Sequence, residues 1–282
     1  MFSFQAMTGT LAQLIALTTY GNEFLKKGSL EDSFYPENST FQFCKTVDFH
    51  EFRKRLFSSK YNEIKINADP NQWFELLKKE KTKVLHLFYR KSEDEKMSPD
   101  HKMAGFVGGG GTWMIEQRCE GFSYYWQARW TVNNDETEDR NRWTVNYGRF
   151  DRKIKSTNLV FSGNMIREEL RKTLSDISAF AYSQNQKGWS ETFQKALYEL
   201  SNQTPEEYYY HKDLLPPGAY SLESRQLLYS AAMSWVFGGM GSWNDIIFDD
   251  PEVEKRYDEL SAKLYGAIND SVLAVVNVVV SG

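Results

Sequence analysis

The sequence predicts an α+β fold, in which a central antiparallel meander sheet of about four or more strands has an N-terminal helical segment and a C-terminal helical layer packed on one of its faces. Three observations predict this class. Apolar residues recur with helical spacing at both ends of the chain. Between residues 83 and 150, short segments alternate apolar and polar residues, as half-buried strands do. A long polar stretch separates the last two of these segments, as in a hairpin.

The length of 282 residues is enough to bury a sizeable core in one domain, and we expect residues 1–282 to form a single α+β domain. A division into residues 1–155, with the N-terminal helices and the sheet, and residues 156–282, which are mainly helical, is the alternative. No linker composition marks the boundary.

The first 70 residues contain two predicted helices, a predicted strand and the start of a third predicted helix. Residues 1–30 have an apolar helical face, and Gly28 is a suitable helix end. Phenylalanine and valine alternate loosely over residues 41–49, which predicts a strand, and a short helix is expected at residues 52–57. Asp69-Pro70 reads as an N-cap followed by a first-turn proline, so another helix is expected to begin there.

The centre of the chain contains four predicted strands, at residues 83–89, 112–118, 122–132 and 142–150. The charged segment 90–102 and the polar segment 133–141 are expected to be loops. The third strand has two distinct faces because successive side chains point to opposite sides. One face carries Tyr124, Trp126, Ala128, Trp130 and Val132, and the other carries Tyr125, Gln127, Arg129 and Thr131.

The last 120 residues are predicted to be mainly helical. Asn164, Ser190 and Ser221 are expected to cap three successive helices. The third of these is expected to run through Trp235 and to end at Gly238. Asp250-Pro251-Glu252 is a strong helix start. For residues 272–280 both readings stay open, because β-branched enrichment favours a strand and unbroken periodicity favours a helix.

One short motif occurs twice: residues 108–113 and 238–243 both read G-G-x-G-[ST]-W. Such loops can bind a ligand, because successive backbone N–H groups form an anion-binding concavity and a hydroxyl and an indole ring follow them. They can equally be structural, where backbone must bend or approach closely. No lysine follows either loop, so neither is a P-loop. The candidate binding residues here are Gly109, Gly111, Thr112, Trp113, Gly239, Gly241, Ser242, Trp243, Asn244 and Asp245.

The aromatic strand residues have two interpretations as well. They could form a stacking platform for a carbohydrate or a base, but they are more often a sheet face packed under helices. We therefore expect the aromatic face to lie in the core. The opposite face, with Glu116, Gln127 and Arg129, is the candidate surface for contacts with a partner.

Composition argues against several classes of function. The net charge is −4 and lysines and arginines do not cluster, so no nucleic-acid partner is expected. No apolar run is long enough to span a bilayer, and the N-terminus does not resemble a signal peptide, so we expect a cytoplasmic protein with no membrane partner. Cys44 and Cys119 are not in C-x-x-C pairs, and the aspartates near Asn244 lack calcium-loop spacing. Neither a metal nor a cofactor is expected.

These observations predict a non-catalytic protein-interaction module whose partner is another protein. Its size, acidity and lack of catalytic motifs are typical of the immunity proteins that neutralise bacterial toxins, so a basic toxin or effector is the expected kind of partner. The alternative is a small-ligand-binding protein or enzyme whose pocket is formed by the two G-G-x-G-[ST]-W loops. In that case Trp113 and Trp243 would stack on the ligand, and Glu116, Asn244 or Asp245 would supply polar or acid–base groups.

Overall fold

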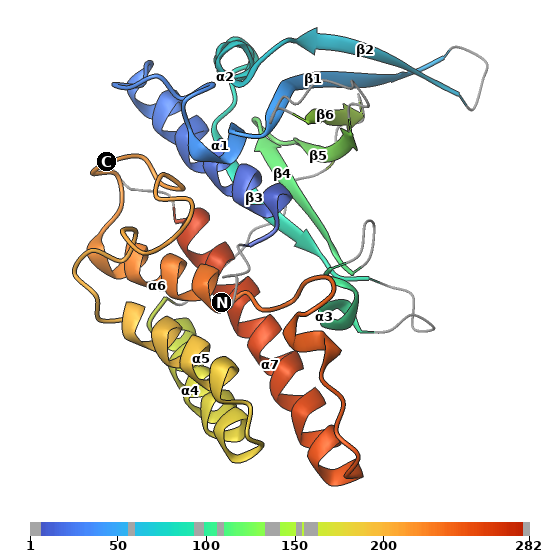
Figure 1. Cartoon of the computed structure of the whole chain (residues 1–282). Helices are drawn as coiled ribbons and strands as arrows, with labels where there is room; N and C mark the ends of the chain where they lie inside the picture. Colours follow the sequence, from blue (N-terminus) through green and yellow to red (C-terminus); the bar gives the residue numbers. More distant parts are fainter. Residues whose placement is uncertain are drawn as a thin grey trace.

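The computed structural model describes residues 7–55, 60–92, 99–105, 110–132, 142–150, 154 and 163–278. Within these residues the chain forms a mixed α and β structure with seven α-helices and one six-stranded sheet, which confirms the predicted class in its broad form. The strands gather at one end of the molecule and the C-terminal helices at the other, with the N-terminal helix between them (Figure 1). Only residues 93–98 of the predicted loop 90–102 lie outside the described residues, as does the whole predicted loop 133–141. Arg90 ends a strand (Val84–Arg90) and residues 100–102 lie in a short helix (Asp100–Met103), so these parts of the predicted loop are wrong.

The sheet has the strand order β2-β1-β6-β5-β4-β3. Strands β3 to β6 pair antiparallel in sequence order, but β1 pairs parallel with β6 and antiparallel with β2. The sheet as a whole is therefore not a meander. Its strands are β1 (Cys44–Lys54), β2 (Tyr61–Asn67), β3 (Val84–Arg90), β4 (Thr112–Arg118), β5 (Ser123–Val132) and β6 (Trp143–Phe150).

The first strand corrects one expectation. Residues 52–54 belong to β1 and not to a short helix, because each pairs with a residue of β2, with Phe52 opposite Glu63. The sequence analysis had also missed β2 itself. All of its first five residues are exposed, so it lacks the apolar alternation by which a half-buried strand is recognised.

Helix α1 (Gly9–Lys27) is the centre of the molecule. The Thr8 side chain accepts a hydrogen bond at its N-terminus, and Gly28, with a φ of 84°, ends it. Every residue from Leu11 to Gly21 is buried, as expected for a helix with neighbours on all sides. It packs on β3 and β4 and also contacts α7. The predicted arrangement, with the C-terminal helices covering the sheet, is thus wrong in detail, because α1 occupies that position.

Helix α2 (Pro70–Lys79) covers the same face of the sheet near β1. Asp69 caps it and Pro70 opens it, as predicted. Its Trp73 is fully buried and stacks on Phe49 of β1, with ring centroids 4.6 Å apart. Trp126 of β5 meets both rings edge-on. Trp126 is therefore part of the core, as expected, whereas the other residues of its predicted face are less buried: Tyr124, Ala128 and Trp130 are partly buried and Val132 is 49% exposed.

The C-terminal helices are α4 (Gly163–Ser183), α5 (Lys187–Glu199), α6 (Leu222–Met233) and α7 (Pro251–Val276). Ser221 and Asp250 cap α6 and α7 as predicted. Asn164 and Ser190 lie inside their helices and are not caps. Helix α6 ends at Met233, well before Gly238. Helix α7 continues through residues 272–276, so this part of the stretch 272–280 is helix, while residues 279–280 lie outside the described residues.

The short elements complete the description. A four-residue helix, α3 (Asp100–Met103), precedes β4, and two 3₁₀ turns lie at Ser39–Phe41 (η1) and Trp243–Asp245 (η2). No helix in the described part of the chain is both long enough and apolar enough to cross a membrane.

Candidate functional site

The candidate site is a groove on the sheet face that α1 and α2 leave open. Along β5 and β6, side chains that point into the core alternate with side chains that point away from it, so one strand contributes to both faces. On the open side the sheet encloses a cavity of about 680 Å³. All six strands contribute to its lining, which consists of His50, Phe52, Glu63, Phe88, Arg90, Met114, Tyr125, Gln127, Ala128, Arg129, Asn146, Gly148, Phe150 and Ile154.

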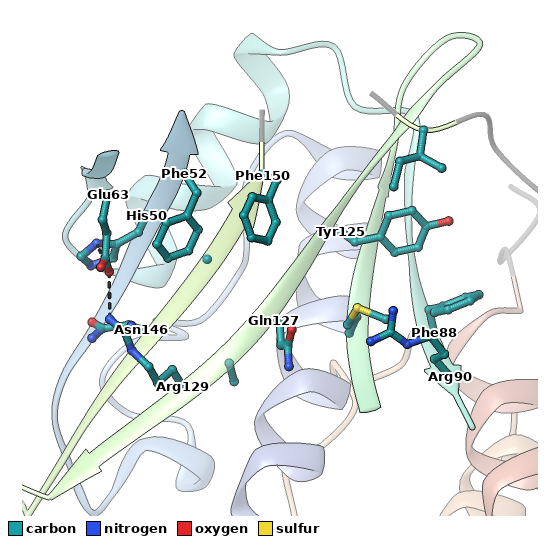
Figure 2. Close-up of a pocket in the computed structure, with 14 residues that line it drawn as sticks. His50, Phe52, Glu63, Phe88, Arg90, Tyr125, Gln127, Arg129, Asn146 and Phe150 are labelled. Carbon is teal, nitrogen blue, oxygen red and sulfur yellow. Dashed lines mark hydrogen bonds and ion pairs between the residues drawn. The ribbon is translucent and has the colours of Figure 1, made fainter. Parts of the chain in front are cut away.

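Aromatic side chains form both ends of this groove (Figure 2). At one end Phe52 and Phe150 lie 5.3 Å apart between ring centroids. At the other end Phe88 and Tyr125 meet edge to face, also at 5.3 Å. Gln127 lies between the two pairs in Figure 2. The groove thus has two apolar ends and a polar middle.

Gly148 makes the first of these ends possible. A Cβ atom at this position would lie 2.4 Å from the Phe52 ring, which is far inside van der Waals contact. Only glycine lets the Phe52 ring lie flat across β6 in this way. Gly148 therefore deepens the groove because it has no side chain.

Most of the charge in the groove is already paired. The Glu63 carboxylate lies 2.9 Å from Arg129 Nη2 and 3.1 Å from His50 Nδ1. Arg90, at the other end, is exposed, and its side chain makes no hydrogen bond or ion pair to any residue of the described chain. Its guanidinium lies beside Phe88 (Figure 2). Within the part of the chain that the structure describes, the groove therefore offers one unpaired cation, the Arg90 side chain, next to an aromatic pair.

Glu116 lies on the same face but is fully buried. Its carboxylate accepts hydrogen bonds from Ser123 Oγ at 2.6 Å and Arg118 Nη2 at 3.2 Å, and His86 Nδ1 lies 3.5 Å away. Burial alone would raise the pKa of this carboxyl, but His86, Ser123 and Arg118 outweigh burial and hold the pKa below its ordinary value. Glu116 thus joins β3, β4 and β5 and does not face the cavity.

Only part of the face that was predicted to contact a partner lines the groove. Gln127 and Arg129 line the groove, and Glu116 supports it from within the sheet. The other lining residues, above all Phe52, Phe88, Arg90 and Phe150, were not predicted. The same period-two reading, applied to β3 and β6 as it was to β5, would have placed Phe88 and Phe150 on this face.

The two G-G-x-G-[ST]-W motifs meet through α3. A Cβ atom on Gly105, just before the first motif, would lie 1.9 Å from the Gly238 carbonyl oxygen of the second. The Asn244 side chain donates a hydrogen bond to the His101 carbonyl at 2.8 Å. On the other side of α3, a Cβ on Gly110 would lie 3.0 Å from the Asp100 carbonyl oxygen. Gly109 lies outside the described residues.

Equivalent glycines in the two motifs have different roles. Gly111 is needed for close approach, because a Cβ there would lie 2.3 Å from the Tyr89 hydroxyl. Gly241, at the same motif position, has a φ of 85°. At Gly239 no atom of the described residues lies within 4 Å of the corresponding Cβ position. The shared letters therefore do not reflect one shared backbone conformation.

The motif tryptophans pack in different surroundings. Trp113 stacks on Tyr89, with ring centroids 4.7 Å apart, and Thr112 begins β4 beside it. Trp243 is fully buried against Trp189, Phe193 and Tyr257 and donates its Nε1 hydrogen to Ser261 Oγ at 2.8 Å. The Trp243 ring is thus covered by protein on all sides, and no face of it is open to a ligand.

The polar residues of the second motif stabilise the turn in which they lie. Ser242 and Asp245 form a capping box, in which the Asp245 carboxylate accepts hydrogen bonds from the Gly241 and Ser242 N–H groups. Asn244 bonds the α3 segment. No group of three or more histidine, cysteine, aspartate or glutamate side chains suited to a metal ion occurs among the residues that the structure describes.

Comparison of this chain with models of protein families, with curated proteins and with solved structures finds no match.

Proposed function

We propose that this chain is a non-catalytic binding protein and that its binding site is the groove on the open face of the sheet. Its partner is a segment of another protein that carries an apolar side chain next to a carboxylate. The observation that carries the proposal is the juxtaposition of Arg90, which has no partner in the described chain, with the Phe88–Tyr125 pair in a cavity of about 680 Å³.

The apolar lining supports binding of an apolar group. Phe150 is 52% exposed, and Tyr61, which meets it edge-on, is 45% exposed. Neighbouring exposed aromatic side chains on one sheet face are a common mark of an interaction site in a soluble chain. A cavity of this size, with aromatic walls and a few polar groups, is typical of a recognition site.

The charges support an acidic partner. Arg129 and His50 already face Glu63, so Arg90 is the lining cation that a bound carboxylate can reach without breaking an ion pair. Arginine binds carboxylates with two parallel hydrogen bonds, which would fix the direction of the bound segment. A basic partner, such as the toxin expected from composition, would meet this cation unfavourably.

The lining also favours binding over catalysis. The described residues that line the groove include no serine, threonine or cysteine. The His50–Glu63 pair resembles the base of a catalytic site, but the described lining offers it no serine, threonine or cysteine to activate.

The test is a selection from a phage-displayed library of random peptides on the immobilised full-length chain. We expect enriched peptides to place an aromatic or aliphatic residue beside aspartate or glutamate. For the best peptide, Arg90→Gln should weaken binding about 10-fold or more, because it removes a charge-assisted hydrogen bond. Arg256→Gln, which changes an exposed arginine on α7, is the matched control and should leave the affinity unchanged.

The other outcomes overturn the proposal. Enrichment of basic peptides would favour the toxin-type partner, and a selection with no enriched sequence would argue against a peptide partner. Equal affinity of the Arg90→Gln variant and the wild-type chain would show that binding occurs elsewhere.

A further inference from the structure

We propose that β2 is an interface for a second copy of this chain, and that two copies pair β2 against β2 so that their sheets become one. The proposal does not depend on the identity of the groove's partner, although Glu63 of β2 also lines the groove and pairs there with Arg129 and His50. It rests on three features: the β3 edge of the sheet is covered whereas the β2 edge is not covered in the described chain, alternate backbone groups of β2 point outward, and β2 carries charges of both signs.

The opposite edge, β3, is closed by two asparagine side chains. Asn22 of α1 accepts a hydrogen bond from the Leu85 N–H at 2.7 Å and donates one to the Leu85 carbonyl at 2.9 Å. Asn277, at the end of α7, does the same at Leu87, at 2.7 and 2.8 Å. Each amide thus takes the place of a neighbouring strand, which protects an edge from pairing with another chain.

The β2 edge has no such cover in the described part of the chain. The Arg55 N–H donates to the Lys60 carbonyl at 3.0 Å, which makes these two residues a hydrogen-bonded pair of the β1–β2 ladder. Hydrogen-bonded and non-bonded pairs alternate in an antiparallel ladder. Ile64 therefore directs its backbone groups toward β1, while those of Glu63 and Lys65 point outward, where no described residue meets them.

The direction of these groups restricts how two β2 strands can pair. A residue whose backbone groups point outward must lie opposite another such residue of the partner strand. These residues alternate along β2, so the twofold axis of the dimer must pass through a residue position and not between two residues. An axis at Glu63 would place two glutamates opposite each other, and an axis at Lys65 would place two lysines opposite each other. Like charges in that position are destabilising.

An axis at Ile64 satisfies both requirements. Glu63 then lies opposite Lys65 of the partner subunit, and Lys65 lies opposite Glu63 of the partner subunit, each as a hydrogen-bonded pair with opposite charges. Ile64, whose side chain is 37% exposed, meets its own copy. This register pairs the whole of β2 and leaves the two grooves on the same face of a continuous sheet.

A cysteine cross-link tests the register. In the proposed dimer the two Ile64 positions form a non-hydrogen-bonded pair with Cα atoms about 4.5 Å apart, which is within the range for a disulfide. Ile64→Cys should therefore give a covalent dimer on mild oxidation. Asn62→Cys is the matched control, because its two copies would lie about 13 Å apart along the strands, and it should stay monomeric on a non-reducing gel.

A charge exchange tests the pairing itself by sedimentation over a concentration series. Glu63→Lys or Lys65→Glu alone should abolish the wild-type dimer, because each places like charges opposite one another. A 1:1 mixture of the two variants should restore a dimer, since a strand with two lysines then faces a strand with two glutamates. Circular dichroism checks that each variant is folded.

Three results overturn the proposal: a wild-type chain that stays monomeric throughout the series, a dimer that survives both charge reversals, or equal cross-linking of the Ile64→Cys and Asn62→Cys variants. None of these measurements involves the peptide partner, so the two proposals fail separately.

Discussion

At the scale of single residues, glycine at position 105 decides whether the two glycine motifs can meet. The Gly238 carbonyl group occupies the space that a side chain would need, and both sides of this contact are backbone. Neither side can therefore turn away as a flexible side chain would. Of the two roles that the sequence allowed for the motifs, these contacts support the structural one.

Gly105→Ala should lower the free energy of unfolding by about 1–3 kcal/mol, as overpacking does. Gly239→Ala, one residue from the same contact, should change it by less than about 0.5 kcal/mol, because nothing lies within 4 Å of its Cβ position. Urea denaturation of the two variants gives the comparison. Equal effects would mean that α3 does not pack on the second motif as described.

Arg149 is the second residue on which local structure depends. It is 3% exposed and lies 2.8 Å from a Glu51 oxygen and 2.5 Å from a Glu80 oxygen, so it joins β6 to β1 and to the end of α2. Its guanidinium also lies over the rings of Tyr124 and Trp126. Burial acts to raise the pKa of both glutamates, but Arg53 and Arg149 outweigh burial at Glu51, as Arg149 and Gln117 do at Glu80, and both pKa values lie below the ordinary value.

Arg149→Leu should lower the free energy of unfolding by about 3 kcal/mol, because it leaves two glutamates with no shared cation in a largely buried site. Arg129→Leu is the matched control. Its ion pair with Glu63 is exposed, and its loss should cost less than about 1 kcal/mol. If chemical denaturation gives the two variants similar stabilities, the Arg149 cluster does not hold α2 to the sheet.

At the scale of elements, local signals predicted the helix starts best. Asp69-Pro70 and Asp250-Pro251 fix their helices within a few residues, because an N-cap and a first-turn proline act on adjacent backbone. The end of α6 was misplaced because residues 235–237 are as apolar as a helix face, yet they are buried outside any helix or strand. There Trp235 Nε1 donates a hydrogen bond to the Phe237 carbonyl.

The β3 edge allows a prediction about a whole strand. Asn22→Ala or Asn277→Ala should each lower the free energy of unfolding by about 1–3 kcal/mol, because each leaves an N–H and a carbonyl of β3 without a protein partner. The double variant should also aggregate, since it exposes a strand edge. Asn71→Ala, at an exposed asparagine of α2, is the control.

Light scattering and urea denaturation measure both effects. A double variant that stays as soluble as the Asn71→Ala control would show that the amides do not protect this edge.

At the scale of the whole molecule, the class of fold could be predicted but the strand order could not. Alternation identifies strands one at a time, and nothing in a strand's own sequence states that β1 joins β6 in parallel. The full lining of the groove could not be predicted for the same reason. Gln127 and Arg129 were found on one strand, while Phe52 and Arg90 lie on strands that only the strand order brings to the same face.

The stability of the whole molecule should fall with acidification in two stages. Burial holds the pKa of His101 and of His211 below the ordinary value of 6.5, so below that pH the unfolded chain binds protons that the native chain does not. Stability is then lost as the pH falls. The second stage begins below about 4.5, where the lowered pKa values of Glu51, Glu80 and Glu116 act with the same sign.

Urea denaturation at a series of pH values separates the stages. In the combined His101→Phe and His211→Asn variant, the free energy of unfolding should change little between pH 7 and pH 5.5. It should still fall below pH 4.5, because the glutamates are unchanged. The slope of the free energy of unfolding against pH is the decisive quantity, since either substitution can shift the stability at every pH by an equal amount. A wild-type stability that is constant from pH 7 to pH 5.5 would contradict the burial of two neutral histidines.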